Sequence, residues 1–225
     1  MEFWIIGFGR VGRRAFKRLR SRRPAARFAI VDPRLCDQPK GLEYVHWFRE
    51  DGLAFMYERR LEIAAEPSPW IVPALPRHLA YDWIYTLLEE TFAVQAKPVP
   101  ATLVAQLPNA VTGSEGQAYI SNADFICPEN CNEPTAGCPV TRRSRHFDLH
   151  VRLADIRVEG IRSVVIRSHQ LAPGVGGYRG RQLEDALQAI KASPGSYLLS
   201  TASKCHGVMH AFSTADQRSR DKEQS

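Results

Sequence analysis

The stretch FWIIGFGRVGRRAFKRLRSRRPAARFAIVDP, residues 3–33, decides the fold of the N-terminal half. It opens with the apolar run 3–6, which is typical of a buried parallel strand. Apolar residues then recur at helical spacing as far as Leu19. A second apolar run, 28–31, ends in Asp32. The order strand, turn, helix, strand predicts a βαβ unit.

Gly7, Gly9 and Gly12 form a G-x-G-x-x-G motif between the first run and the helix. Gly7 permits a tight turn, Gly9 lets a pyrophosphate approach the backbone, and Gly12 lets the helix pack closely on the strand. The helix N-terminus, which begins near Arg10, presents unpaired N–H groups to phosphates. Asp32 lies 20 residues after Gly12 and is placed to accept hydrogen bonds from the adenosine ribose. The motif therefore predicts an NAD(H) site.

Two residues after the second run bear on the choice of dinucleotide. Asp32 favours NAD over NADP, because a carboxylate repels a 2′-phosphate. Arg34 follows two residues later and leaves the choice open. The alternative is a Rossmann-like domain that has kept the turn and binds no nucleotide.

The segment IIGFGRVGRRAFKRL, followed by FAIVDP, resembles the NAD-binding domain of potassium-uptake regulators, the Trk or RCK-type N-terminal domain. The resemblance covers roughly the first 100 residues, and many dehydrogenases share its motif. It implies a Rossmann-like fold and NAD binding. It also implies a regulatory alternative, in which the domain senses NAD(H) and signals to a potassium transporter.

Composition limits the classes of protein that fit. At 225 residues and 44% apolar content, the chain can bury a substantial core. No apolar run is long enough for a membrane span, and the N-terminus MEFWIIGFGR lacks the basic and long apolar regions of a signal peptide. We therefore expect a cytoplasmic protein, in which cysteine thiols stay reduced.

The net charge of +6 is concentrated in residues 9–24 and 141–146. No nucleic-acid-binding signature accompanies these arginines, and no aromatic residues alternate with them as a stacking platform. The pattern favours a solvated helix face over nucleic-acid binding.

The middle of the chain predicts further alternating elements. Residues 42–47 and 70–75 are expected to be strands, residues 52–64 a helix or helical turn, and a helix follows from Leu79. His78 precedes that helix, in a loop that passes the cofactor in nucleotide-binding folds. It is a candidate proton carrier near the nicotinamide, and the alternative is a residue that caps the helix.

Three of the five cysteines lie in CPENCNEPTAGCP, residues 127–139. Their spacing, C-x3-C-x6-C, matches neither a zinc finger nor a bacterial ferredoxin. A metal site needs about four ligands, so we expect a fourth from elsewhere in the chain. The candidate metal ligands are Cys127, Cys131, Cys138 and Cys205, with His206 or Cys36 as alternatives to Cys205. The alternatives for their role are an iron–sulfur cluster, zinc, or unligated, redox-active thiols.

Residues 161–207 repeat the order strand, glycine-rich stretch, helix, strand. Strands are expected at 164–166 and from Tyr197, and residues 173–180 are expected to form a loop before a helix. In that loop Gly174, Gly176 and Gly177 offer a second anion site, with a tight loop without ligand as the alternative. The sequence also places His169 near the expected edge of this sheet, as a second candidate proton carrier.

The sequence therefore predicts an α/β protein with a Rossmann-like, doubly wound and mostly parallel sheet and a cysteine-rich loop insertion. The expected domains are an NAD-binding half (1–110), a second α/β half (111–212) and a disordered tail (213–225). The function expected is that of an NAD(H)-binding redox protein with an iron–sulfur cluster or zinc, acting as an oxidoreductase or electron-transfer component. A redox partner protein and self-association into a homo-oligomer are both compatible with the sequence.

Overall fold

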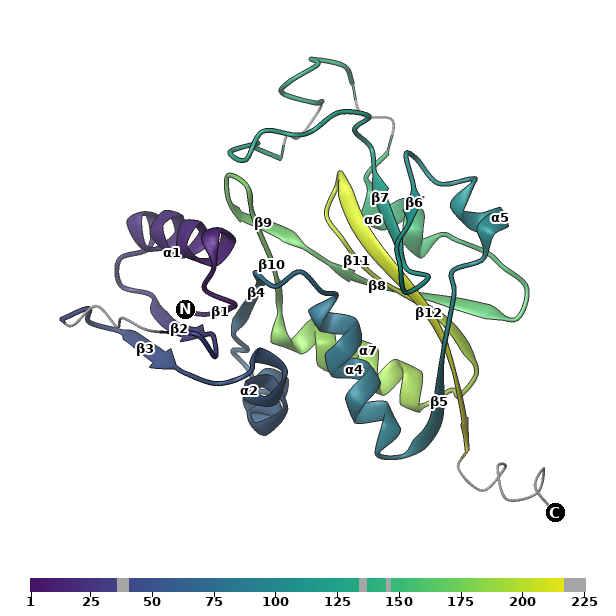
Figure 1. The fold of residues 1–225 in the computed structure, drawn as a ribbon, viewed down its shortest axis with the longest axis horizontal. Coiled ribbons are helices and arrows are strands. Elements are labelled where there is room, and N and C mark those ends of the chain that lie inside the picture. The colour runs from purple at the N-terminus through teal and green to yellow at the C-terminus, as the bar shows by residue number, and fades with distance from the viewer. Residues whose placement is uncertain (36–40, 134–136, 145–146, 217–225) are drawn as a thin grey trace. The chain divides into compact units, whose positions relative to one another are not determined.

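The computed structural model describes residues 1–35, 41–133, 137–144 and 147–216. The chain forms two compact units (Figure 1). The first unit comprises Met1–Leu79, Pro128–Asn132 and Ser168–Glu184, and the second comprises Ala80–Cys127, Glu133–Arg167 and Asp185–Ser225. Each unit contains its own mixed sheet, so the α/β class is confirmed, with two sheets in place of the single one expected.

The sheet of the first unit has the strand order β3-β2-β1-β4-β10-β9. Its first four strands are parallel, and β10 and β9 extend the sheet with antiparallel pairing. The bounds are β1 (Glu2–Ile6), β2 (Arg27–Val31), β3 (Val45–Phe48), β4 (Trp70–Pro73), β9 (His169–Ala172) and β10 (Val175–Arg179). Strands β1 and β2 are buried almost throughout, which is why both are continuous apolar runs in the sequence.

Helix α1 (Arg10–Arg22) joins β1 to β2 and turns Gly12, Ala15 and Leu19 inward at helical spacing. Further on, Asp51 caps α2 (Gly52–Glu58) by accepting hydrogen bonds from two backbone N–H groups. A break at the next residue separates α2 from α3 (Arg60–Ala64), so the helix expected over 52–64 is two short helices. The core beneath α1 is apolar and rich in aromatic residues, with Phe3, Phe28 and Ile30 fully buried.

The sheet of the second unit has the order β6-β7-β12-β11-β8, with β5 also paired to β12. Only β8 and β11 run parallel, so this sheet is not the mostly parallel one expected. The bounds are β5 (Phe92–Lys97), β6 (Val111–Thr112), β7 (Ala118–Ser121), β8 (Ile161–Arg167), β11 (Ser196–Ala202) and β12 (His206–Asp216). Figure 1 shows β12 as the long yellow strand, which pairs along one edge with β7 and, further along, with β5.

The remaining helices are α4 (Leu79–Glu89), α5 (Ala101–Val104), α6 (Leu149–Ala154) and α7 (Gly180–Lys191). Helix α6 packs on the sheet of the second unit and buries Leu149 and Leu153. The boundary between the units falls inside both α4 and α7. In the described part of the chain, no helix combines the length and the apolar character that a membrane crossing requires.

Two expectations for the C-terminal half are wrong. The glycine-rich stretch 173–180 is not a loop: Val175–Arg179 forms β10, which pairs with β4 and β9. Glycines are unusual within strands, and at Gly177 the Ile71 carbonyl of the neighbouring strand leaves no room for a side chain. Residues 213–216, expected in a disordered tail, form the end of β12, and 217–225 lie outside the described residues.

Candidate functional site

The glycine turn of the first unit has a different geometry at each of its three glycines. Gly7 has φ +96°, a conformation that favours glycine. At Gly12 a Cβ would lie 2.0 Å from the Gly7 carbonyl oxygen, so the helix can approach the turn only without a side chain there. At Gly9 an added Cβ would meet no atom of the described chain within 4 Å. The turn is thus tight at Gly7 and Gly12 and open above Gly9.

Asp32 follows β2 and is buried, with 6% of its surface exposed. Its Oδ2 accepts a hydrogen bond from the Phe8 backbone N–H at 2.7 Å, and its Oδ1 accepts one from the Arg34 backbone N–H at 2.8 Å. The Arg34 side chain lies 3.8 Å from Oδ1 and is largely exposed. Asp32 therefore ties the glycine turn to the end of β2, a role that sequence analysis did not predict.

The first turns of α1 are strongly positive. Gly9 offers no side-chain cap, and no acidic residue lies in the first turn. Arg10 is the first helical residue, and Arg13 donates to the Phe8 carbonyl and lies over the Phe8 ring. The positive end of the helix dipole and these guanidinium groups add together. The local field therefore attracts anions.

The segment Pro128–Asn132 of the cysteine-rich stretch lies against α1. Glu129 Oε1 contacts Arg14 Nη2 at 2.7 Å and Arg10 Nη1 at 3.5 Å. The hydrogen bond from Arg14 lowers the pKa of Glu129 and outweighs the opposing effect of desolvation, and the charges of Arg14, Arg10 and Arg18 add to the lowering. Arg18 Nη1 donates to the carbonyls of Glu129 at 2.8 Å and Pro173 at 2.6 Å.

Cys131 belongs to the same segment and is fixed by its main chain. Its carbonyl accepts hydrogen bonds from the Gly174 N–H at 3.0 Å and from Gln170 Nε2 at 2.7 Å. Gly174 has φ +63°, and a Cβ there would lie 1.8 Å from the Glu129 carbonyl oxygen. The turn between β9 and β10 therefore needs glycine because the cysteine segment presses on it.

Cys205 lies in the tight turn between β11 and β12 in the second unit. The Ser203 N–H donates to the His206 carbonyl, and Ser203 Oγ accepts from the N–H groups of Cys205 and His206. Glu133 Oε1 accepts from the Lys204 N–H at 2.7 Å and ties the cysteine-rich stretch to this turn. His206 Nδ1 lies 3.2 Å from Ser121 Oγ.

The structure distributes the predicted metal ligands over both units. Cys131 belongs to the first unit, and Cys127, Cys138 and Cys205 belong to the second. All four are half-buried thiols, and Cys131 and Cys138 take part in hydrogen-bonded turns. Across residues 1–35, 41–133, 137–144 and 147–216, no group of three His, Cys, Asp or Glu side chains is arranged to hold one metal ion. Cys36 lies outside the described residues.

The structure places His78 directly before α4, with 7% of its surface exposed, and His169 at the start of β9. The His169 ring packs edge-on against Trp70. At Gly177 a Cβ would lie 2.8 Å from the Ile71 carbonyl oxygen, and at Gly176 it would lie 2.9 Å from Ser168 Oγ. Close packing against the Ile71 carbonyl accounts for Gly177, whereas at Gly176 only the rotatable Ser168 hydroxyl would have to move. Both glycines lie in β10 rather than at a helix N-terminus.

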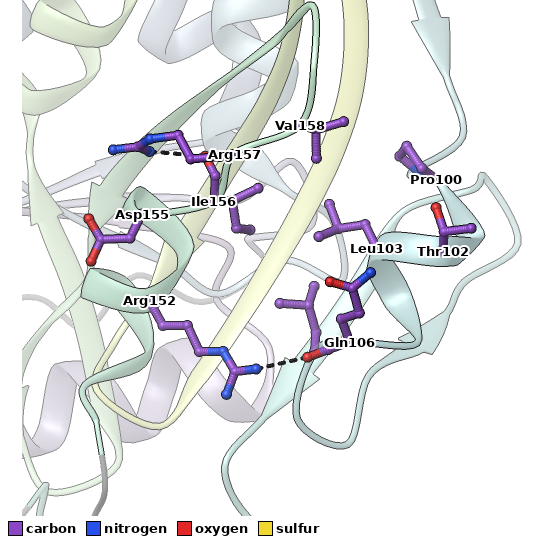
Figure 2. Close-up of a pocket in the computed structure, with 10 residues that line it drawn as sticks. Pro100, Thr102, Leu103, Gln106, Arg152, Asp155, Ile156, Arg157 and Val158 are labelled. Carbon is purple, nitrogen blue, oxygen red and sulfur yellow. Dashed lines mark hydrogen bonds between the residues drawn. The ribbon is translucent and has the colours of Figure 1, made fainter.

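A pocket of about 450 Å³ opens in the second unit between α5 and residues 152–158. Apolar side chains, among them Leu103, Ile156 and Val158, line it together with polar and charged ones (Figure 2). Arg152 Nη2 donates to the Gln106 carbonyl at 2.8 Å, and Arg157 Nη1 donates to backbone carbonyls of its own segment. The guanidinium group of Arg152 therefore joins the two segments that line the pocket, and that of Arg157 stabilises its own segment.

The second unit begins at Ala80, and a family model begins at the same residue. The model of the AF_1314_C family, described as "Uncharacterized protein, C-terminal domain", matches residues 80–215. The chain belongs to this family. The match includes Cys127, Cys131, Cys138 and Cys205 and lies entirely outside the glycine turn. No curated protein and no solved structure matches the chain.

Sequence analysis missed the residues that connect the cysteine-rich stretch to α1: Glu129, Arg14 and Arg18. The signal available was the excess of arginine on α1 together with two glutamates in the cysteine-rich stretch. Charge alone could not pair them, because Arg18 and Glu129 are 111 residues apart.

Proposed function

We propose that the protein binds NAD(H) at the glycine turn of its first unit. The observation that carries this proposal is the opening above Gly9, between two glycines that the packing requires. A pyrophosphate needs that space in order to reach the N–H groups at the start of α1. The parallel order β3-β2-β1-β4, which matches the first four strands of the order 3-2-1-4-5-6 in dinucleotide-binding folds, supports the proposal.

Asp32 and Arg34 would act at the ribose end of the site. Each Asp32 carboxylate oxygen already accepts one backbone hydrogen bond, and each keeps a second lone pair for a ribose hydroxyl. Calorimetric titration with NADH is expected to give saturable heat. A titration with NADPH on the same preparation would show whether Arg34 admits a 2′-phosphate. A flat NADH titration would overturn the proposal.

In the redox form of this proposal, the protein is a cytoplasmic oxidoreductase or electron-transfer component, and the cysteines of the family domain bind an iron–sulfur cluster or zinc. Its support is the clustering of Cys127, Cys131 and Cys138 within twelve positions and the anchoring of the Cys205 turn to Glu133. An iron–sulfur cluster would provide a one-electron carrier, and zinc a Lewis acid. Metal analysis and a visible spectrum of anaerobically purified protein separate these cases. If the protein contains no metal and shows no charge-transfer band, thiol chemistry is the only one of these roles that remains for the cysteines.

A non-catalytic, NAD(H)-sensing role of the RCK type is the second candidate. It is favoured by the contact of the cysteine-rich stretch with α1, because a regulator needs a segment that responds to the occupied site. Such a protein would bind NADH and leave it chemically unchanged. Incubation with NADH and an artificial electron acceptor is expected to consume NADH only if the oxidoreductase form is correct.

A further inference from the structure

We propose that Pro128–Asn132 is an autoinhibitory latch, in which Glu129 holds the arginines of α1 that a dinucleotide phosphate would otherwise recruit. This inference rests on the proposed NAD(H) site and describes how that site is regulated. The latch is defined as residues 128–132 in contact with Arg10, Arg14 and Arg18.

Glu129 supplies the anion that the start of α1 lacks. The helix has no acid of its own in the first turn, and its first five residues include Arg10, Arg13 and Arg14. A carboxylate at this position interacts favourably with the positive end of the helix dipole and with the arginine side chains, as a phosphate would. In the absence of nucleotide, Glu129 is therefore an intramolecular substitute for the ligand's charge.

The two contacts of Glu129 differ in strength and exposure. Arg14 lies at 2.7 Å and its side chain is 23% exposed, whereas Arg10 lies at 3.5 Å and is 82% exposed. Arg14 is the anchor of the latch. Arg10 is the arginine that can change partners, because it is the first helical residue and lies next to the open position at Gly9.

The main chain of the latch has its own anchors. Arg18 joins the carbonyls of Glu129 and Pro173, and the Gly174 N–H and Gln170 Nε2 both donate to the Cys131 carbonyl. These bonds place Glu129 without using its carboxylate. Removal of the carboxylate's charge therefore tests regulation separately from the folding of the segment.

The latch and the ligand oppose one another. A pyrophosphate brings two negative charges to the turn, and Glu129 adds a like charge within reach of the same guanidinium group. Binding of the dinucleotide is therefore expected to weaken the hold of Glu129 on Arg10. Cys131, two residues along the latch, then becomes more accessible.

The test compares Glu129→Gln with the unchanged full-length protein. Gln keeps the shape and loses the charge, so NADH is expected to bind about two- to fivefold more tightly at low ionic strength, the range of an exposed ion pair. The gain should shrink as salt is added. The matched control is Glu62→Gln, which removes one negative charge from α3 of the same unit and should leave NADH affinity unchanged.

The second readout is the alkylation rate of Cys131, followed by mass spectrometry of the labelled peptide. Saturating NADH is expected to speed alkylation in the unchanged protein, and Glu129→Gln is expected to speed it without NADH. Equal NADH affinity in the two proteins would overturn the latch and leave the NAD(H) site standing. An unchanged alkylation rate with NADH would also overturn it. Absence of NADH binding in both proteins would overturn the proposed function itself.

Discussion

At the scale of single residues, the three glycines of the turn have separable roles. Gly12 is required by packing, because its hydrogen faces the Gly7 carbonyl, whereas Gly9 faces open space with an ordinary φ of −70°. A side chain at Gly9 is therefore compatible with the fold and conflicts only with a ligand. A side chain at Gly12 conflicts with the fold.

Gly12→Ala is expected to destabilise the protein by about 3 kcal/mol, the upper range for overpacking a buried site. Gly9→Ala is expected to leave the free energy of unfolding nearly unchanged and to abolish NADH binding. Denaturant unfolding measures the first effect and calorimetry the second. Full NADH affinity in Gly9→Ala would show that no phosphate approaches this position.

Asp32→Asn tests the structural role of the buried carboxylate. Asp32 uses one oxygen for the Phe8 N–H and the other for the Arg34 N–H, so the amide nitrogen of Asn would face an N–H donor. We expect a loss of about 1–3 kcal/mol of stability.

The matched control for this change is Asp51→Asn at the start of α2. Asp51 accepts both of its hydrogen bonds at a single oxygen, Oδ1, which Asn retains. Asn is also as good a helix cap as Asp, so the free energy of unfolding should hardly change. Equal losses in the two variants would contradict the pairing described for Asp32.

At the scale of elements, the sequence predicted strands that are continuous apolar runs, such as β1 and β2, and missed others, among them the short, glycine-rich β10. The strands β1 and β2 can be recognised in the sequence as apolar runs, because parallel strands buried on both faces contain few polar residues. Strand β10 contains two glycines, and its neighbours in the sheet come from elsewhere in the chain. Its pairing with β4 joins residues about a hundred positions apart, which no local periodicity reveals.

The attachment of the latch to α1 can be tested through its hydrogen bonds. Arg18→Met removes the donor to the Glu129 and Pro173 carbonyls and keeps an apolar stem. We expect the amides of Cys131 and Gly174 to exchange hydrogen about tenfold faster, as loss of charge-assisted bonds implies. Arg22→Met, at the end of the same helix, is the control and should leave these amides unchanged. Unchanged exchange in Arg18→Met would show that the segment holds to α1 by other means.

At the scale of the whole molecule, the chain is not divided into the two contiguous halves that its sequence suggests. The first unit takes in 128–132 and 168–184 from the second half, and the family match begins where the second unit first begins. The glycine turn and the family domain are therefore distinct parts of one chain. Sequence patterns could locate the glycine turn, but they could not show which distant segments complete the first unit.

Stability of the second unit is expected to fall in mild acid because of His210. This residue is 9% exposed, its ring stacks on Tyr81 at 4.0 Å, and burial lowers its pKa despite the opposing charges of Asp82 and Glu115. The unfolded chain therefore binds a proton more readily than the folded one. The stabilising contribution is present above the unfolded value of 6.5 and is lost as pH falls through the lower folded pKa.

The free energy of unfolding should accordingly decrease between pH 7.5 and pH 5, and His210→Phe, which keeps an aromatic ring against Tyr81, should reduce that decrease. Part of the slope should remain, because burial and then the charge of Arg167 lower the pKa of His150. His46→Gln on β3 alters an exposed histidine and should leave the slope as it is in the unchanged protein. Denaturant unfolding at several pH values measures all three proteins. A slope that His210→Phe does not alter would mean that His210 takes up its proton as readily in the folded chain as in the unfolded one.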